Sequence, residues 1–167
     1  RNTDHEPPYE ACIKSNSVVF IYIFDSAFFD QAEYNQRHFN FICESLTHLK
    51  YPNLWVFKGN TLNIFESIFN QFDVVNLFSY AETGLNYTWN IDKQIKNLTI
   101  KYAVSWSEFQ YAGVKRGRYN RSKWGDDWVN TMLEPQKNPI INKLRLIDIP
   151  LELRNNLFDF MVYSNNR

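Results

Sequence analysis

The sequence predicts an α/β fold, an open parallel doubly wound (Rossmann-like) sheet with helices on both faces. Two observations carry this prediction. Short apolar runs of strand length alternate along the chain with longer segments whose apolar residues recur at helical spacing. The strongest run, 18–24, reads V-V-F-I-Y-I-F and contains only β-branched and aromatic residues. Such a run is typical of a strand buried on both faces of a parallel sheet.

The first half of the chain continues with two more strand-and-helix pairs. Segment 35–50 is predicted to be a helix, because its apolar residues are spaced to share one face: Phe39, Ile42, Cys43, Leu46 and Leu49. The run L-W-V-F at 54–57 predicts a second strand. The pair Gly59–Asn60 then turns the chain into a helix over 61–72.

The second half begins with a third strand at 74–78, followed by a helix over 87–101 and a short fourth strand at 103–106. The sequence then predicts a short helix at 123–133. Segment 134–139 holds two prolines and is expected to be extended. A last, exposed helix is predicted over 150–161.

Composition limits the classes of function. With 167 residues and 44% hydrophobic content, the chain can bury one core. Its net charge is zero, so no global field favours nucleic acid or acidic partners. The two cysteines, Cys12 and Cys43, have no metal-type spacing, which predicts no disulfide framework, no metal site and a reducing, cytoplasmic location. No apolar run approaches the roughly 18 residues that a membrane span needs, so no membrane association is expected.

The motifs of several enzyme classes are missing from the sequence. It contains neither G-x-G-x-x-G nor G-x-x-x-x-G-K-[ST], so no phosphate-cradling dinucleotide loop is expected. The three histidines are scattered, and no Ser or Cys has a readable His and acid partner. These observations argue against a stand-alone dehydrogenase or nucleotide hydrolase.

Ligands of open parallel sheets bind beyond the carboxyl ends of the strands. That rule selects two segments here. Asp25 begins the first, directly after the strand at 18–24, and segment 79–84 follows the third strand. The alternatives are a helix-capping role for Asp25 and a simple strand-to-helix turn at 82–84, with Thr88 as the cap.

A third candidate is the loop after the fourth strand, where cations alternate with aromatic rings. Its basic residues are Lys115, Arg116, Arg118 and Arg121. Interleaved cations and rings suit phosphate contact and base stacking. The alternative is pairing with another domain. Trp124, Trp128 and Met132 recur every four residues, which predicts one helix face packed in a core, with an electron-transfer relay as the alternative.

Several segments, in order, resemble the photolyase/cryptochrome family. The opening R-N-T-D-H-E-P matches at Arg1, Asp4, His5, Glu6 and Pro7, and I-Y-I-F-D follows at 21–25. E-T-G at 82–84 precedes T-W-x-x-D, and G-V-K-R at 113–116 precedes W-x-x-x-W-x-x-x-M. The resemblance covers the chain from Arg1 to about Pro139, and it points to a bacterial member.

The resemblance implies a photolyase-type amino-terminal α/β domain at 1–133. Segment 134–167 would be a linker and the start of a helical segment leading to a flavin-binding domain outside this chain. The parent would be a deoxyribodipyrimidine photolyase, a carbon–carbon lyase, or a cryptochrome-like photoreceptor. Its FAD would lie in the other domain, so this chain alone would be catalytically silent and would meet DNA only through the full-length protein.

In this family the amino-terminal domain can hold a light-harvesting antenna. The resemblance implies a folate, flavin or deazaflavin cofactor in contact with the residues at the strand ends, with Glu82 accepting hydrogen bonds from its ring and Gly84 allowing close approach. Those residues are Asp25, Tyr80, Glu82, Thr83 and Gly84. Lys115, Arg116, Arg118 and Arg121 would contact the flavin-binding helical domain or phosphates.

One departure from the family pattern has a structural consequence. The family's first strand runs into the matching arginine and is central in the sheet, and here it is missing. We expect its absence to leave an unpaired edge on each neighbouring strand. Self-association is therefore expected through these edges or through the apolar tail, Leu157, Phe158, Phe160, Met161 and Tyr163. Two other interpretations stay open: a stand-alone antenna-cofactor or nucleotide-binding module, and a generic flavodoxin-like domain.

Overall fold

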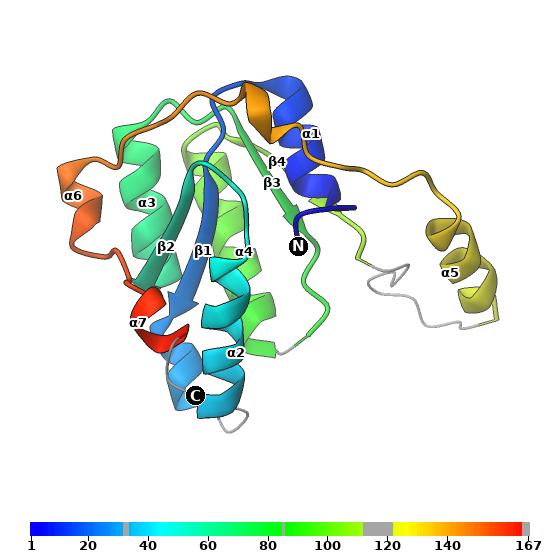
Figure 1. Cartoon of the computed structure of the whole chain (residues 1–167), viewed down its shortest axis with the longest axis horizontal. Helices are drawn as coiled ribbons and strands as arrows, with labels where there is room; N and C mark the ends of the chain where they lie inside the picture. The colour runs from blue at the N-terminus through cyan, green and yellow to red at the C-terminus, as the bar shows by residue number, and fades with distance from the viewer. Residues whose placement is uncertain (32–33, 85, 112–121, 165–167) are drawn as a thin grey trace. The chain divides into compact units, whose positions relative to one another are not determined.

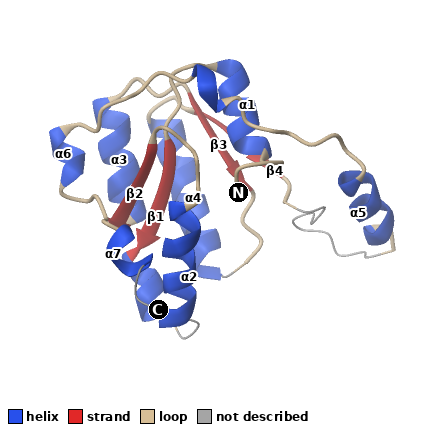
Figure 2. Cartoon of the chain, in the orientation of Figure 1, coloured by secondary structure: helices blue, strands red, loops and turns tan. Residues whose placement is uncertain are grey.

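The computed structural model describes residues 1–31, 34–84, 86–111 and 122–164, and it has a mixed α/β structure (Figure 1). Helices alternate with short strands along the chain, as Figure 2 shows by colour. The chain divides into two compact units. The first contains Arg1–Asn2, Ser15–Asp73 and Ile141–Arg167, and the second contains Thr3–Lys14 and Val74–Ile140. The expected boundary at 133 does not coincide with a division between these units.

Two parallel strands form the sheet of the first unit. β1 (Phe20–Asp25) pairs with β2 (Leu54–Gly59) in a register that runs from Phe20 opposite Leu54 to Asp25 opposite Gly59. Both strands occur where the sequence predicts them, with β1 beginning two residues later. Only Phe20 and Phe24 of β1 are buried, so the expectation of a strand buried on both faces is wrong.

Asparagine caps position the helices of this unit. A short 3-10 helix, η1 (Ser26–Asp30), follows β1. Asn35 caps α2 (Gln36–Thr47) by accepting a hydrogen bond from the Arg37 amide, and Asn60 caps α3 (Thr61–Gln71) in the same way from the Asn63 amide. Such a cap satisfies one of the amide groups that a helix start leaves unpaired. The predicted helices at 35–50 and 61–72 are therefore confirmed.

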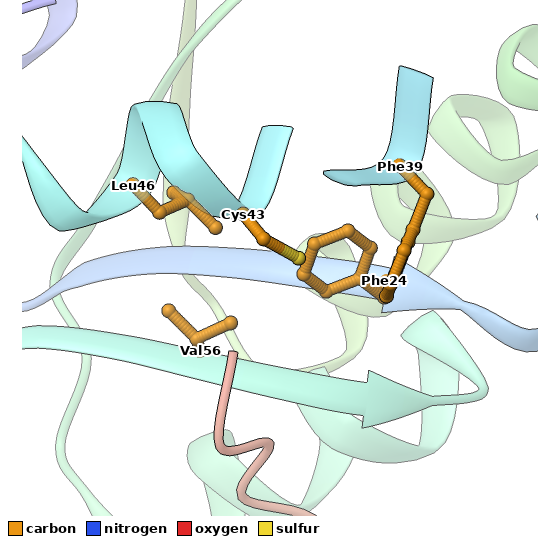
Figure 3. Packing of buried hydrophobic residues seen from close by; sticks show 5 residues of the cluster. All are labelled: Phe24, Phe39, Cys43, Leu46 and Val56. Carbon is orange, nitrogen blue, oxygen red and sulfur yellow. The ribbon is translucent and has the colours of Figure 1, made fainter. Parts of the chain in front are cut away.

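The core of the first unit lies between α2 and the two strands. Figure 3 shows Phe39, Cys43 and Leu46 of α2 directed toward the strand side chains Phe24 and Val56. The rings of Phe24 and Phe39 lie 5.1 Å apart, centroid to centroid. The helical spacing in the sequence therefore identified the buried face of α2.

A buried asparagine joins three segments of this unit. The Asn53 side chain is 3% exposed. Its amide donates to the carbonyl oxygens of Val18 and Arg145, at 2.8 and 2.7 Å, and its Oδ1 accepts from the Ile147 amide at 3.1 Å. A buried amide is stable only when its polar atoms are paired, and here both are.

The predicted helix over 150–161 is wrong. The structure has a short 3-10 helix, η2 (Ile141–Lys143), and two single turns, α6 (Leu151–Arg154) and α7 (Met161–Ser164). Between the turns, Leu157 forms an antiparallel bridge with Phe57 of β2, and the Lys58 amide donates to the Asn156 carbonyl. The open edge of β2 forms hydrogen bonds with these backbone groups. In a continuous helix the same groups would bond to one another.

The tail residues after Pro150 are only partly exposed. Leu153 is fully buried, and Phe158 and Phe160 pack against the core of the first unit. Met161 and Tyr163 are exposed, although the Tyr163 ring contacts Phe39. The expectation of a wholly exposed apolar tail is therefore wrong for its middle part.

The second unit has its own parallel pair. β3 (Asn76–Tyr80) pairs with β4 (Ser105–Phe109), from Asn76 opposite Ser105 to Tyr80 opposite Phe109. α1 (Glu6–Lys14) packs on this pair, and α4 (Asn86–Lys101) connects its strands. α5 (Trp124–Met132) follows in the chain. The predicted strands at 74–78 and 103–106 are confirmed with ends shifted by about two residues, as is common at boundaries.

The chain leaves α4 through Ala103, which lies two residues beyond the helix and has a left-handed backbone. Ala103 has φ 55°, and the Val104 amide donates to the Thr99 carbonyl at 2.8 Å. Glycine is the usual residue at this position, because a Cβ atom is unfavourable there.

The described residues form two separate parallel pairs rather than one continuous sheet. The strand orders are β1-β2 and β3-β4, so β1 and β3 each have one strand partner within the described ranges. None of the helices in these ranges combines the length and apolar character needed to cross a bilayer.

Candidate functional site

An aromatic cluster lies at the carboxyl end of the parallel pair in the second unit. Tyr80 is the last residue of β3. The His5 ring stacks on the Tyr80 ring with centroids 5.5 Å apart and planes 11° apart. The Tyr111 ring meets Tyr80 edge-on at 5.1 Å. The cluster therefore joins the start of α1 to the ends of β3 and β4.

The start of α1 fixes the orientation of Tyr80. The backbone amide of Glu6 donates a hydrogen bond to the Tyr80 hydroxyl oxygen at 3.1 Å. The first amides of a helix have no partner inside the helix, so a side-chain acceptor here satisfies one of them. The Tyr80 side chain is therefore fixed by the His5 ring on its face and by the Glu6 amide at its hydroxyl group.

The segment before α1 is tied to residues 137–138. The Asp4 amide donates to Asn138 Oδ1 at 2.8 Å, and the His5 amide donates to the Lys137 carbonyl at 2.8 Å. The Lys137 ammonium pairs with the Glu6 carboxylate. Asp4 has φ 48°, a left-handed conformation that Asp tolerates better than most residues. These contacts position His5 against Tyr80.

The Lys137–Glu6 pair changes the acid–base behaviour of the lysine. The hydrogen bond that the Lys137 ammonium donates to the Glu6 carboxylate raises the pKa of Lys137 above its ordinary range, against a smaller opposing effect of burial. Both side chains are less than one-third exposed. The pair lies at the start of α1, next to His5 of the aromatic cluster.

A buried amide donor follows β4. Gln110 Nε2 is shielded from solvent and has no hydrogen-bond partner in the described residues. Gln110 lies between Phe109, the last residue of β4, and Tyr111 of the cluster. Buried donors are normally paired, so this unpaired donor next in sequence to Tyr111 is a candidate ligand contact.

The predicted contacts at 82–84 form a local turn in the structure. The Glu82 carboxylate accepts a hydrogen bond from the Gly84 amide. A Cβ atom at position 84 would lie 2.8 Å from Glu82 Oε1, so glycine here makes room for that carboxylate. Thr83 and Gly84 are exposed. This geometry is the turn that the sequence left open as the alternative, but the cap predicted with it is wrong, because Thr88 lies inside α4, which begins at Asn86.

Asp25 belongs to the first unit, and its carboxylate is used inside it. Oδ1 accepts from the Ala27 amide at 2.9 Å and caps η1. Oδ2 accepts from the Thr61 amide at 2.9 Å and from the Thr61 hydroxyl at 2.5 Å. Asp25 thus joins the end of β1 to the start of α3, in the capping role that the sequence allowed.

The four basic residues, Lys115, Arg116, Arg118 and Arg121, lie outside the described residues. The helix that follows them is described, and it differs from the prediction. Trp124, Trp128 and Met132 are exposed, and no residue of α5 is buried. The prediction that this stripe packs in a core is therefore wrong.

Sequence reasoning selected Tyr80 but missed two members of its cluster. His5 belongs to the opening motif and Tyr111 follows the fourth strand, and neither pattern indicates a contact with Tyr80. The Glu6–Tyr80 contact spans 74 positions, so only the expectation that α1 packs on β3 could have predicted it.

Other kinds of site are not formed by the described residues. They contain no group of three or more His, Cys, Asp or Glu that could hold a metal ion. Cys12 and Cys43 are free thiols, and burial raises the pKa of both. A thiol with a raised pKa is a poor nucleophile at neutral pH.

Comparison with known proteins assigns this chain to no family. No family model matches this chain, and no curated protein matches it.

Proposed function

We propose that this chain is the amino-terminal α/β domain of a photolyase- or cryptochrome-like blue-light flavoprotein. In this proposal it acts as a scaffold that is catalytically silent alone and holds an antenna ring at the Tyr80 cluster. The parent performs light-dependent DNA repair or photoreception with FAD in a separate helical domain. The Rossmann-like, doubly wound sheet that the family resemblance implies is part of the proposal.

The observation that carries the proposal is the aromatic cluster at a strand end. Tyr80, His5 and Tyr111 meet where the general rule for parallel α/β sheets locates ligands. Planar rings stack favourably on aromatic side chains, and each such pair contributes about 1 kcal/mol beyond burial. A folate, flavin or deazaflavin offers such a ring.

Two polar side chains that follow the strand ends suit a ring with hydrogen-bonding edges. Gln110 Nε2, after β4, is a shielded donor without a partner in the described residues, and a ring carbonyl is the kind of acceptor it lacks. Glu82, after β3, has a carboxylate that accepts from the Gly84 amide, and a carboxylate is the kind of acceptor that a ring N–H needs.

The binding test uses the purified protein and one ligand from each class: a reduced folate, FMN and a deazaflavin. Titration is followed by absorbance and fluorescence. We expect saturable binding of one ligand, weakened at least about tenfold by Tyr80→Ala, as for loss of a buried aromatic contact. Tyr9→Ala, a half-buried tyrosine of α1 that is not one of the three cluster residues, is the matched control and should keep the affinity.

A second test addresses catalytic silence. The protein is mixed with FAD and DNA carrying pyrimidine dimers and is illuminated with blue light. We expect no dimer repair above the protein-free control, because the proposed flavin site is in the other domain. Light-dependent turnover by this chain would contradict the proposal.

The main alternative is a stand-alone module that binds an antenna cofactor or a nucleotide. The same aromatic cluster favours it, because stacking does not distinguish these rings. Titration with ATP and FMN in parallel separates the two. Tyr80-dependent binding of ATP without binding of any antenna-type ring would favour the alternative.

A further inference from the structure

α5 carries an apolar face that remains exposed among the described residues. Five large side chains of this segment are exposed, from 46% for Val129 to 78% for Leu133. At about 100° per residue they cover roughly half of the helix circumference. We call them the α5 face: Trp124, Trp128, Val129, Met132 and Leu133.

An acidic residue flanks the α5 face. Asp126 is exposed and lies beside Leu133 on the helical wheel, whereas the neighbouring Asp127 is half-buried with Oδ2 shielded from solvent. A helix of nine residues is marginal in water by itself, and an amphipathic helix gains its stability from packing its apolar side. The α5 face therefore needs a partner surface that is apolar in the middle and basic at its rim.

α4 has an exposed face of that kind. Trp89 is 44% exposed and Ile100 is 72% exposed. Lys93 and Lys96 are exposed between them, and the Lys93 ammonium lies 4.0 Å from the centre of the Trp89 ring. These four residues occur at positions i, i+4, i+7 and i+11, so they form one stripe along the helix, which we call the α4 face.

The two faces complement each other in hydrophobicity and in charge. We propose that the α5 face of one molecule docks on the α4 face of a second copy of this chain. The tryptophans and Leu133 of α5 would cover Trp89 and Ile100, and the exposed Asp126 would meet the lysine pair Lys93 and Lys96. Both faces are exposed in the single chain, so they are accessible to a second molecule.

Two copies of the α5–α4 contact would make the assembly a closed dimer. If α5 of each molecule docks on α4 of the other, the contact occurs twice and satisfies a two-fold axis, with no face left over for further growth. One short helix buries too little surface for a stable complex, since specific interfaces bury roughly 1,200–2,000 Å² in total. Two helix contacts, each with two or more tryptophans, approach that range.

The first test is sedimentation equilibrium of the full chain across the micromolar range. We expect a reversible dimer. Trp128→Glu on the α5 face and Trp89→Glu on the α4 face should each weaken dimerisation at least about tenfold. Leu146→Glu is the control, because Leu146 is 81% exposed and lies on neither face. Far-ultraviolet circular dichroism checks that each variant keeps its helices.

Mixing the two variants tests the pairing itself. Trp128→Glu protein retains the α4 face, and Trp89→Glu protein retains the α5 face, so one intact contact forms only in the mixed dimer. We expect the mixture to associate more strongly than either variant alone. Charge reversal gives a second test: Asp126→Lys should weaken the dimer, and Asp126→Lys with Lys96→Glu should regain part of the loss.

Three results would overturn the proposal. The first is a wild-type protein that stays monomeric throughout the concentration range, which would leave the α5 face for another protein. The second is a dimer that survives Trp89→Glu or Trp128→Glu in a folded variant. The third is a mixture of the two variants that associates no better than its components.

Discussion

The ring of His5 stacks on the ring of Tyr80 at a centroid distance of 5.5 Å, and this contact joins the start of α1 to the end of β3. The adjoining Glu6 amide donates to the Tyr80 hydroxyl. Tyr80 at the end of β3 therefore contacts residues at the start of α1 and, through the Tyr111 ring, the segment that follows β4.

Removal of the Tyr80 hydroxyl should destabilise the fold. Tyr80→Phe keeps the ring but leaves the partly buried Glu6 amide without its acceptor. We expect the free energy of unfolding to fall by about 1 kcal/mol, as for the loss of one hydrogen bond. Urea denaturation measures this change. Tyr9→Phe is the matched control, because the Tyr9 hydroxyl forms no hydrogen bond within the described ranges; an equal loss in both variants would contradict the assigned role.

Asn53 should be among the most sensitive positions of the first unit. Asn53→Ala removes three hydrogen bonds and leaves the Val18 and Arg145 carbonyls and the Ile147 amide without this partner. We expect a loss of about 3 kcal/mol, since each abandoned buried group adds to the cost. Thermal and urea unfolding measure it. Asn97→Ala, on the exposed side of α4, should change stability by less than about 0.5 kcal/mol.

Ala103→Gly is expected to stabilise the protein. The left-handed conformation of Ala103, with φ 55°, costs an L-residue about 1–2 kcal/mol, and glycine avoids this cost while losing more entropy on folding. The net gain should be about 0.5–1 kcal/mol. Ala11→Gly, inside α1, should have the opposite sign. A loss of stability in Ala103→Gly would show that α4 does not end as described.

The Lys137–Glu6 pair should stabilise the fold in a defined pH range. Because the folded-state pKa of Lys137 is raised, its contribution is fully present below the unfolded pKa of about 10.4 and is lost as the pH rises through the folded value. Lys137→Met should therefore lower stability at pH 8, and the difference from wild type should shrink toward pH 11. Lys143→Met is the control at an exposed site. A difference that is constant with pH would contradict the linkage.

Periodic segments of the chain could be predicted from the sequence, and segments stabilised by distant partners could not. The spacing of Phe39, Cys43 and Leu46 identified α2 because each faces the same core. The conformation of residues 155–160 depends on a distant partner, because their backbone groups bond to the edge of β2, more than 90 positions earlier in the chain. The local sequence pattern therefore predicts a helix that does not form.

The candidate site was predictable only in part for the same reason. Tyr80 lies at the end of a recognisable strand, where the strand-end rule predicts ligand contacts. The hydrogen bonds that Asp25 accepts from Ala27 and Thr61 could not be predicted, because the sequence does not show where α3 starts relative to β1. The exposure of α5 was missed because a regular stripe such as Trp124 and Trp128 shows that a helix has an apolar face, but does not show what covers that face.

The most direct test of the central claim is ring binding at Tyr80. Wild-type protein and Tyr80→Ala are titrated with a reduced folate, FMN and a deazaflavin, and fluorescence gives the dissociation constants. The account predicts saturable binding of one ring by the wild type and affinity at least about tenfold lower in the variant. Absence of binding for all three rings, or equal affinity in the two proteins, would contradict it.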